Sequence, residues 1–310
     1  MHIEIFIQRG AQMELLRTLE TIRSPFLDFL FGLITRLGEE TILVVAICAI
    51  YWCINKHMGY IMSLTFFLSS LAVQGLKIVF RLPRPWIVDP TFEPVGGATR
   101  MATGYTFPSG HTQNGAAILG SLGLQLRHKA PKIILITLAF LVAASRLYLG
   151  VHFLSDVIAS LVITFAVIWV AMRVIPKEAT CIKRELIIPG VLVALGTLVI
   201  VYAAVLYARD ISQASQIRDS VRTAGASIGF GVGMFVERMY IRFLVKAKSI
   251  LWQALKLVLG IVGVVAIQEG VRLISSSLPM DVVRYFLMVI WMTVVYPLVI
   301  RRFFQVEDEG

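Results

Sequence analysis

The sequence predicts an all-helical bundle that crosses a membrane several times. Of its 310 residues, 57% are hydrophobic and only 15% are charged, whereas soluble domains carry about 25% charged residues. The mean hydropathy is +0.80. The apolar segments are as long as a bilayer-spanning helix requires, and they lack the alternation typical of barrel strands. A cytosolic enzyme and a disordered chain are therefore excluded.

The first element is an N-terminal segment, residues 1–39, that precedes the bundle. Apolar side chains such as Leu15 are interleaved there with charged ones such as Arg17, a mixture that predicts one or two amphipathic helices in the membrane interface. Within this segment, residues 24–38 are apolar but short and include Asp28. A crossing by these residues is the less favoured alternative, and it is left open.

Nine apolar segments follow, each close to the roughly 20 residues that a bilayer crossing needs. They cover residues 40–55, 58–80, 111–127, 131–149, 152–173, 186–207, 223–237, 250–273 and 282–300. We expect the first five helices to form a core over residues 40–175 and the other four to form an extension over residues 176–310. In the extension, Gly225, Gly229 and Gly233 recur at every fourth residue, which predicts a close helix-packing face.

The basic residues of the loops indicate the orientation of the chain. All seven loop lysines lie on one face of the predicted bundle, namely Lys56, Lys129, Lys132, Lys177, Lys183, Lys246 and Lys248. The positive-inside rule puts that face, with the C-terminus, in the cytoplasm. The long loop over residues 81–108 then opens on the extracytoplasmic side. In a membrane chain the net charge of +10 is explained by these loops, so no nucleic-acid partner is expected.

Five residues around the long loop predict a phosphate site. Lys77, Arg84 and Arg146 bring three cations to one face of the membrane, and ionisable residues are costly there unless they have a function. The planar fork of arginine matches phosphate oxygens two at a time. Ser109 and Gly110 open the third apolar helix, whose N-terminal N–H groups favour an anion, and glycine lets the backbone approach it closely.

Two histidines and one carboxylate near this site predict the chemistry. His152 and Asp156 are four residues apart and would share one face of a helix. A carboxylate bonded to one ring nitrogen fixes the tautomer and leaves the other nitrogen as a nucleophile. His111, from a different helix, could protonate the leaving oxygen and then activate water. Because cations hold the anion, no metal and no other cofactor is expected.

These residues form three clusters that resemble the type 2 phosphatidic acid phosphatase superfamily. The family motifs K-x6-RP, PSGH and SR-x5-H-x3-D are complete and in order between Lys77 and Asp156. The resemblance implies that His152 is the nucleophile that forms a phosphohistidine, that Asp156 orients it and that His111 is the general acid and base. It assigns the phosphate to Lys77, Arg84, Ser109, Gly110 and Arg146. The expected nine-helix layout is similar to that of glucose-6-phosphatase and sphingosine-1-phosphate phosphatase.

The function expected from these features is that of a membrane phosphatase that hydrolyses a phosphate monoester or a diphosphate at the extracytoplasmic face. A site near the membrane surface favours an amphiphilic substrate, such as an isoprenoid diphosphate, a phosphatidate-like lipid or a sphingoid phosphate. A soluble sugar phosphate is the nearest alternative substrate, and transfer to a hydroxyl acceptor is the alternative reaction. A non-enzymatic lipid-phosphate carrier ranks low. The expected partners are the lipid bilayer and this substrate, and the expected location is a bacterial inner membrane.

Overall fold

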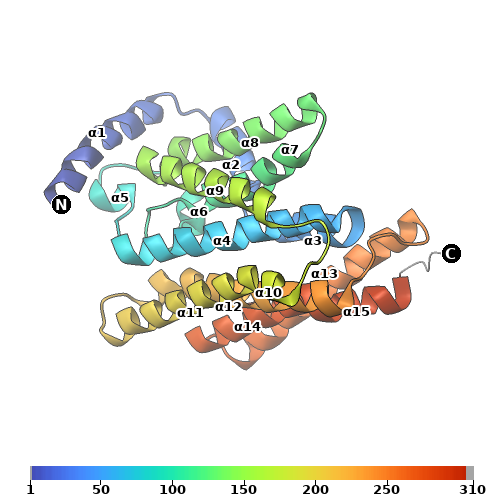
Figure 1. Ribbon diagram of the computed structural model, residues 1–310. Coiled ribbons are helices and arrows are strands. Elements are labelled where there is room, and N and C mark those ends of the chain that lie inside the picture. Colours follow the sequence, from blue (N-terminus) through green and yellow to red (C-terminus); the bar gives the residue numbers. More distant parts are fainter. Residues whose placement is uncertain (1, 305–310) are drawn as a thin grey trace. The chain divides into compact units, whose positions relative to one another are not determined.

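The computed structural model describes residues 2–304, except for the side chains of residues 2–9, 100 and 101. Helices account for its regular structure, with no strand among these residues, so the predicted fold class is confirmed (Figure 1). The helices are α1 (His2–Thr21), α2 (Pro25–Arg36), α3 (Glu40–Ala49), α4 (Lys56–Phe80), α5 (Pro85–Val88), α6 (Gly110–Gly115), α7 (Ser121–Gln125), α8 (Lys129–Tyr148), α9 (Leu154–Val174), α10 (Ile182–Glu185), α11 (Ile187–Ala208), α12 (Ala214–Val236), α13 (Ile250–Ile274), α14 (Leu278–Ile290) and α15 (Tyr296–Val299). Residues 305–310, the C-terminal end that we expect in the cytoplasm, lie outside the described part.

Six helical segments of the described chain are long and apolar enough to cross a membrane. They are Lys56–Val88, Lys129–Tyr148, Leu154–Val174, Ile182–Ala208, Ile250–Ile274 and Leu278–Phe304. A seventh crossing is possible if α2 and α3, which pass the same test only as a pair bent by 46°, form one span. The chain is thus an integral membrane protein with several spans.

The expected count of nine spans is not confirmed, because three of the nine predicted segments do not meet the length and composition of a span by themselves. Residues 40–55 reach a sufficient apolar length only together with α2. Residues 111–127 form the short helices α6 and α7, joined by a π-helical turn. Residues 223–237 belong to α12, whose first half carries charged side chains. The count of nine crossings therefore stays a prediction, and six or seven are supported by helix length and composition.

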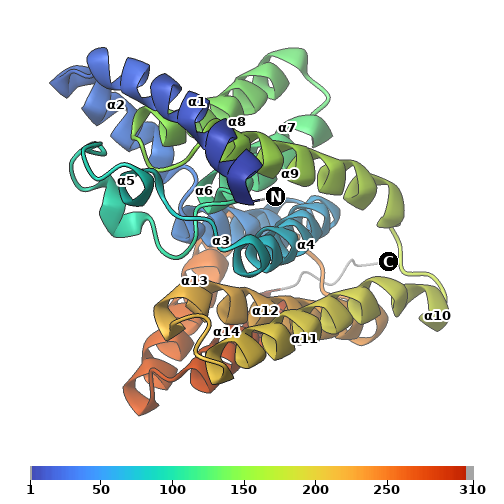
Figure 2. The same ribbon diagram turned by 90° about the vertical axis from the view of Figure 1, so that its left-hand side faces the viewer.

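The chain divides into two compact units, and α3, α4 and α9 contribute residues to both. The first unit comprises Met1–Leu43 and Ala72–Val167, and its helix α8 contacts α1, α2, α6 and α7 (Figures 1 and 2). The ring of Tyr148 at the end of α8 stacks on Phe31 of α2 with centroids 4.3 Å apart, and its hydroxyl donates to Asp28 at 2.7 Å. Helix α2 is therefore packed into this unit.

The second unit comprises Val44–Leu71 and Ile168–Gly310. Its helix α12 packs against both α11 and α14 (Figure 1). A Cβ atom added at Gly229 would lie 2.8 Å from the carbonyl oxygen of Phe286 on α14, and one added at Gly225 or Gly233 would overlap atoms of the same facing segment. The close-packing glycine face predicted from the sequence is confirmed.

Candidate active site

All eight residues that the sequence singles out lie in the first unit, at or next to the ends of its helices. Lys77 is in the last turn of α4, and Arg84 directly precedes α5. Ser109 caps the N-terminus of α6, which Gly110 and His111 begin. Arg146 is in the last turn of α8, His152 is in the turn after it, and Asp156 is in the first turn of α9. Each is therefore held at a helix end.

The imidazole of His152 and the carboxylate of Asp156 form a buried pair. The distance from Nδ1 of His152 to Oδ2 of Asp156 is 3.4 Å. The same Oδ2 accepts a hydrogen bond from the backbone N–H of Phe153 at 2.9 Å, as an acidic residue in the first turn of a helix commonly does. His152 thus lies just before α9 and not on it. Pairing of the two side chains comes from the capped start of that helix and not from a shared helical face.

Thr106 contacts both members of this pair, and it is not among the residues predicted from the sequence. Its hydroxyl donates to Oδ2 of Asp156 at 2.5 Å and lies 3.3 Å from Nδ1 of His152. Its backbone N–H donates to the carbonyl of Leu82 at 3.0 Å, which ties the segment before α6 to the segment before α5. The only sequence signal was its position two residues before the PSGH motif.

Arg84 contacts the second ring nitrogen of His152, Nε2. Its Nη1 donates to Nε2 of His152 and to the carbonyl of Val151, both at 3.0 Å. Its Nε and Nη2 donate to the carbonyls of Gly104 at 3.2 Å and Thr103 at 2.5 Å. Because a guanidinium can only donate, Nε2 must be the unprotonated nitrogen, and the ring proton resides on Nδ1, toward Asp156.

The buried guanidinium of Arg146 has two nitrogens without a hydrogen-bond partner among the described residues. Nη1 donates to the hydroxyl of Thr35 at 2.6 Å, while Nε and Nη2 have no hydrogen-bond partner among the described residues. Nε2 of His111 is likewise buried without such a partner. A buried polar group left unpaired is destabilising by about 1–3 kcal/mol. These atoms together suit a ligand that accepts several hydrogen bonds.

The remaining predicted residues surround the start of α6. A Cβ atom at Gly110 would lie 3.9 Å from Nζ of Lys77, so the amine stands beside the helix N-terminus. The N–H groups of Gly110 and His111 donate to no other described residue. The buried hydroxyl of Ser109 accepts from the N–H of Thr112 at 3.4 Å and thereby caps the helix. The hydroxyl keeps its own hydrogen to donate, so its assignment to the phosphate stays a prediction.

The cations of the site act on His152 electrostatically. Burial, followed by the positive charges of Arg84, Arg146 and Lys77, holds the pKa of His152 well below its ordinary value of 6.5. Burial, followed by the positive charges of Arg146, Lys77 and Arg84, likewise holds the pKa of His111 well below 6.5. The imidazole of His152 is therefore neutral at physiological pH, in agreement with the tautomer that Arg84 imposes.

A second layer of contacts fixes the backbone in front of His152. Gly150 has a φ of +73°, in the left-handed region that favours glycine, and a Cβ atom there would lie 2.7 Å from the ring of Phe92. That ring is covered by the guanidinium groups of Arg17 and Arg23, each 5.3 Å from its centroid. Arg17 also pairs with Asp89 at 2.7 Å. Helix α1 therefore holds the loop that supports the turn containing His152.

No three His, Cys, Asp or Glu side chains within the described ranges are grouped so that they could hold a metal ion. The predicted independence from metals stays a prediction. The ring of Trp86, which the sequence places two residues beyond Arg84, has its centroid 5.9 Å from the Arg84 guanidinium carbon.

Comparison with known protein families gives two matches along the chain. Residues 58–179 match the PAP2 superfamily, and residues 221–308 match the transmembrane extension of PAP2 superfamily phosphatases. The first match contains all eight residues of the site, whereas Thr35 and helix α1 lie outside it.

Individual relatives are also similar to the chain. Phosphatidylglycerophosphatase B of Bacillus subtilis is 32% identical over 44% of this chain and 70% of that protein. An undecaprenyl-diphosphatase of Sulfolobus acidocaldarius is 27% identical over 55% of this chain and 80% of that protein. A probable sphingosine-1-phosphate phosphatase of Dictyostelium discoideum is 28% identical over 47% of this chain, but the match spans only 38% of that protein.

Proposed function

Because the chain belongs to the PAP2 superfamily of membrane phosphatases, we propose that it hydrolyses the phosphate monoester or diphosphate of a membrane lipid through a phosphohistidine formed on His152. The observation that carries this proposal is the set of buried donors without partners, Nε and Nη2 of Arg146 and Nε2 of His111, in the same unit as the paired His152 and Asp156. A phosphoryl group accepts several hydrogen bonds at once and satisfies them.

In the first step, Nε2 of His152 attacks the phosphorus atom in line with the ester oxygen. The phosphate anion that enters beside His111 raises the pKa of this ring and lets it carry a proton. The new N–P bond forms as the P–O bond to the leaving group breaks, and protonated His111 gives that proton to the leaving oxygen. As the substrate enters, Nη1 of Arg84 gives up its hydrogen bond to Nε2 of His152 and donates to a phosphoryl oxygen instead. Asp156 then stabilises the positive charge that develops on the ring of His152.

In the second step, water replaces the departed alcohol or phosphate. His111 accepts a proton from this water, whose oxygen attacks phosphorus, and the N–P bond breaks to return the electron pair to Nε2 of His152. Lys77, Arg84 and Arg146 neutralise the charge on the equatorial oxygens in both steps. The N–H groups of Gly110 and His111 at the start of α6 add donors for the same oxygens.

A lipid substrate is supported by two features of the chain. Lys77, Arg146 and Asp156 lie near the ends of helices that can cross a membrane, so a headgroup can reach them while its tail stays in the bilayer. Each of the three relatives above is named for an amphiphilic phosphate. A sugar phosphate and transfer to a hydroxyl acceptor remain the competing substrate and reaction.

Phosphate release by the purified full chain tests this proposal. We expect release from one or more lipid phosphates in a panel that also contains sugar phosphates, with and without an added alcohol acceptor. His152→Ala should lower kcat by at least roughly 1,000-fold because no other group can form the N–P bond. His128→Ala, a change at an exposed histidine in a loop, is the matched control and should leave kcat unchanged.

Near-normal turnover by the His152→Ala variant would remove the phosphohistidine from the mechanism. Turnover of sugar phosphates with none of the lipid phosphates would reassign the substrate. A phosphorylated alcohol formed at the expense of free phosphate would reassign the reaction to transfer.

A further inference from the structure

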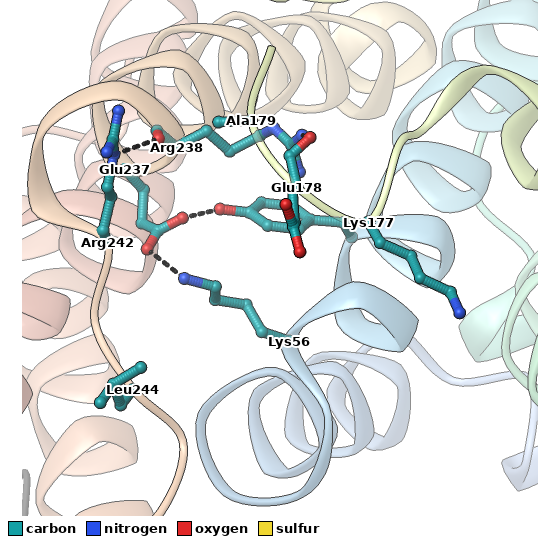
Figure 3. Close-up of a pocket in the computed structure, with 9 residues that line it drawn as sticks. Lys56, Lys177, Glu178, Ala179, Glu237, Arg238, Arg242 and Leu244 are labelled. Carbon is teal, nitrogen blue, oxygen red and sulfur yellow. Dashed lines mark hydrogen bonds and ion pairs between the residues drawn. The ribbon is translucent and has the colours of Figure 1, made fainter. Parts of the chain in front are cut away.

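A cavity of about 380 Å³ lies in the second unit, distinct in its residues from the site described above (Figure 3). It is bordered by the start of α4, by the segment that follows α9 and by the π-helical turn and loop that follow α12. Its charged lining consists of Lys56, Lys177, Glu178, Glu237, Arg238 and Arg242. Four cations therefore face two carboxylates.

The carboxylate of Glu237 is fully used inside the protein. Its Oε1 accepts from Nζ of Lys56 at 2.9 Å and from the N–H of Phe243 at 3.2 Å, and its Oε2 accepts from the hydroxyl of Tyr60 (Figure 3). The side chain of Glu237 is buried. This carboxylate therefore balances Lys56 and does not neutralise Lys177 or Arg242.

Arg238 is held rigidly but keeps one donor nitrogen. Its Nε lies 2.6 Å from Oε2 of Glu185, and its Nη2 donates to Oε1 of Glu185 at 3.2 Å and to the carbonyls of Pro176 at 3.3 Å and Glu178 at 3.0 Å. Nη1 of Arg238 makes no hydrogen bond with the described residues. The guanidinium therefore presents a positioned donor with no entropic penalty for ordering it.

Lys177 and Arg242 supply the excess positive charge. The amine of Lys177 makes no ion pair with any residue the structure describes, and Arg242 donates only through Nε, to the carbonyl of Arg238 at 3.3 Å. Glu178 is the one lining carboxylate that opposes these two cations. The cavity thus has a net positive charge and an available arginine fork.

The position of the cavity along the helices sets its depth in the membrane. Lys56 is the first residue of a membrane-crossing segment, so the cavity lies at the level of lipid headgroups. The exposed side chain of Leu244 adds an apolar wall. All four cations belong to the basic loops that the sequence assigns to the cytoplasmic face, where anionic lipids attract basic residues.

We propose that this cavity is a second phosphate site that binds an anionic phosphate group, either the headgroup of an acidic lipid or inorganic phosphate. Arg242 offers its two terminal nitrogens, Arg238 offers Nη1, and Lys177 adds a mobile charge at the rim. The site does not depend on the reaction proposed above, because it uses none of the same residues.

Native mass spectrometry of the full chain in detergent tests the site with three probes: inorganic phosphate, a short-chain phosphatidylglycerol and a short-chain phosphatidylcholine. The variant Lys177→Gln with Arg242→Gln removes two exposed cations that stabilise no described ion pair. The matched control, Lys183→Gln with Arg184→Gln, removes the same two charges from exposed positions outside the cavity.

We expect the cavity variant to bind one anionic probe, inorganic phosphate or phosphatidylglycerol, fewer per chain than the control. The dissociation constant of the cavity for that probe should rise roughly 30-fold. The separate variant Glu178→Gln removes the opposing carboxylate and should lower the dissociation constant of the cavity about fivefold relative to the unmodified chain. Phosphatidylglycerol bound more tightly than inorganic phosphate assigns the site to a lipid headgroup, and the reverse order assigns it to the free ion.

Equal stoichiometry in the cavity variant and the control would overturn the proposal, as would binding of phosphatidylcholine as tight as that of the anionic probes. The comparison remains valid if the catalytic proposal fails. In that case the catalytic site binds no phosphate in either the cavity variant or the control. The control still binds one phosphate more per chain than the cavity variant.

Discussion

Thr106 and Asp156 show how single side chains determine the state of the nucleophile. Two donors, the hydroxyl of Thr106 and the N–H of Phe153, fix one oxygen of the Asp156 carboxylate beneath Nδ1 of His152. Arg84 occupies Nε2 from the other side. The ring is thus held in one tautomer and one orientation before a substrate arrives, so little reorganisation is needed at the moment of reaction.

Thr106→Val keeps the shape of the side chain but removes its hydroxyl. We expect kcat to fall by roughly 10- to 100-fold, because a hydrogen bond to a charged group is worth about 1.5–3 kcal/mol. KM should change little, since Thr106 makes no hydrogen bond with the residues assigned to the phosphate. Thr106→Ser, measured in the same phosphate-release assay, should restore most of the activity. A rise in KM with kcat intact would instead place Thr106 in substrate binding.

The pH dependence of kcat/KM should reflect the lowered pKa of His152. A histidine whose pKa lies below 6.5 stays neutral, and therefore nucleophilic, as the pH falls through 6.5. The acid limb that belongs to the enzyme should accordingly lie below pH 6.5. Profiles measured with two substrates whose phosphate groups have different pKa values identify the limb of the enzyme. The limb caused by titration of the substrate shifts between the two profiles, whereas the limb caused by His152 does not. An enzyme limb at or above 6.5 would contradict the assignment.

At the scale of elements, periodicity and motifs predicted the parts of the fold that a short stretch of sequence determines. The glycines of α12 were predicted as a packing face because their spacing alone puts them on one side of a helix. The three motifs fixed which residues stand at the ends of α4, α6, α8 and α9. Thr35 could not be found in this way, because its contact with Arg146 joins positions 111 residues apart and no motif includes it.

The pairing of α12 with α14 can be tested by enlarging one glycine. Gly229→Ala places a methyl group 2.8 Å from the backbone oxygen of Phe286, which cannot move aside as a side chain would. Unfolding in detergent, followed by circular dichroism, should show a loss of roughly 1–3 kcal/mol. Gly190→Ala is the matched control, since nothing lies within 4 Å of the added atom on α11, and it should not destabilise the protein. Equal effects would mean that close contact does not limit the substitution at Gly229.

At the scale of the whole molecule, the number of spans was the property least accessible from sequence. Hydropathy recognises apolar segments, but it does not show that residues 111–127 contain a π-helical turn or that α2 and α3 reach a crossing length only as a bent pair. The side on which each loop lies rests on the distribution of basic residues, and that orientation is still a prediction.

Labelling of cysteines from one side of the membrane tests the orientation. In a chain with Cys48 and Cys53 replaced by serine, Gly96→Cys provides a thiol in the loop that we assign to the outside, and a side chain there meets no neighbour within 4 Å. The native Cys181 is exposed and provides a thiol on the side assigned to the cytoplasm. An impermeant maleimide added outside intact cells should modify position 96 and spare Cys181. The opposite pattern would invert the proposed topology.

The bond between Thr35 and Arg146 has a consequence for dissecting the protein into pieces. A fragment that starts after α2 would retain every family motif and all eight residues of the site, yet it would lack the hydroxyl that Nη1 of Arg146 needs as an acceptor. Such a fragment would contain every motif, but Nη1 of the buried Arg146 would lose its hydrogen-bond partner, in addition to Nε and Nη2. Shortened versions of this enzyme should therefore begin upstream of Ser24.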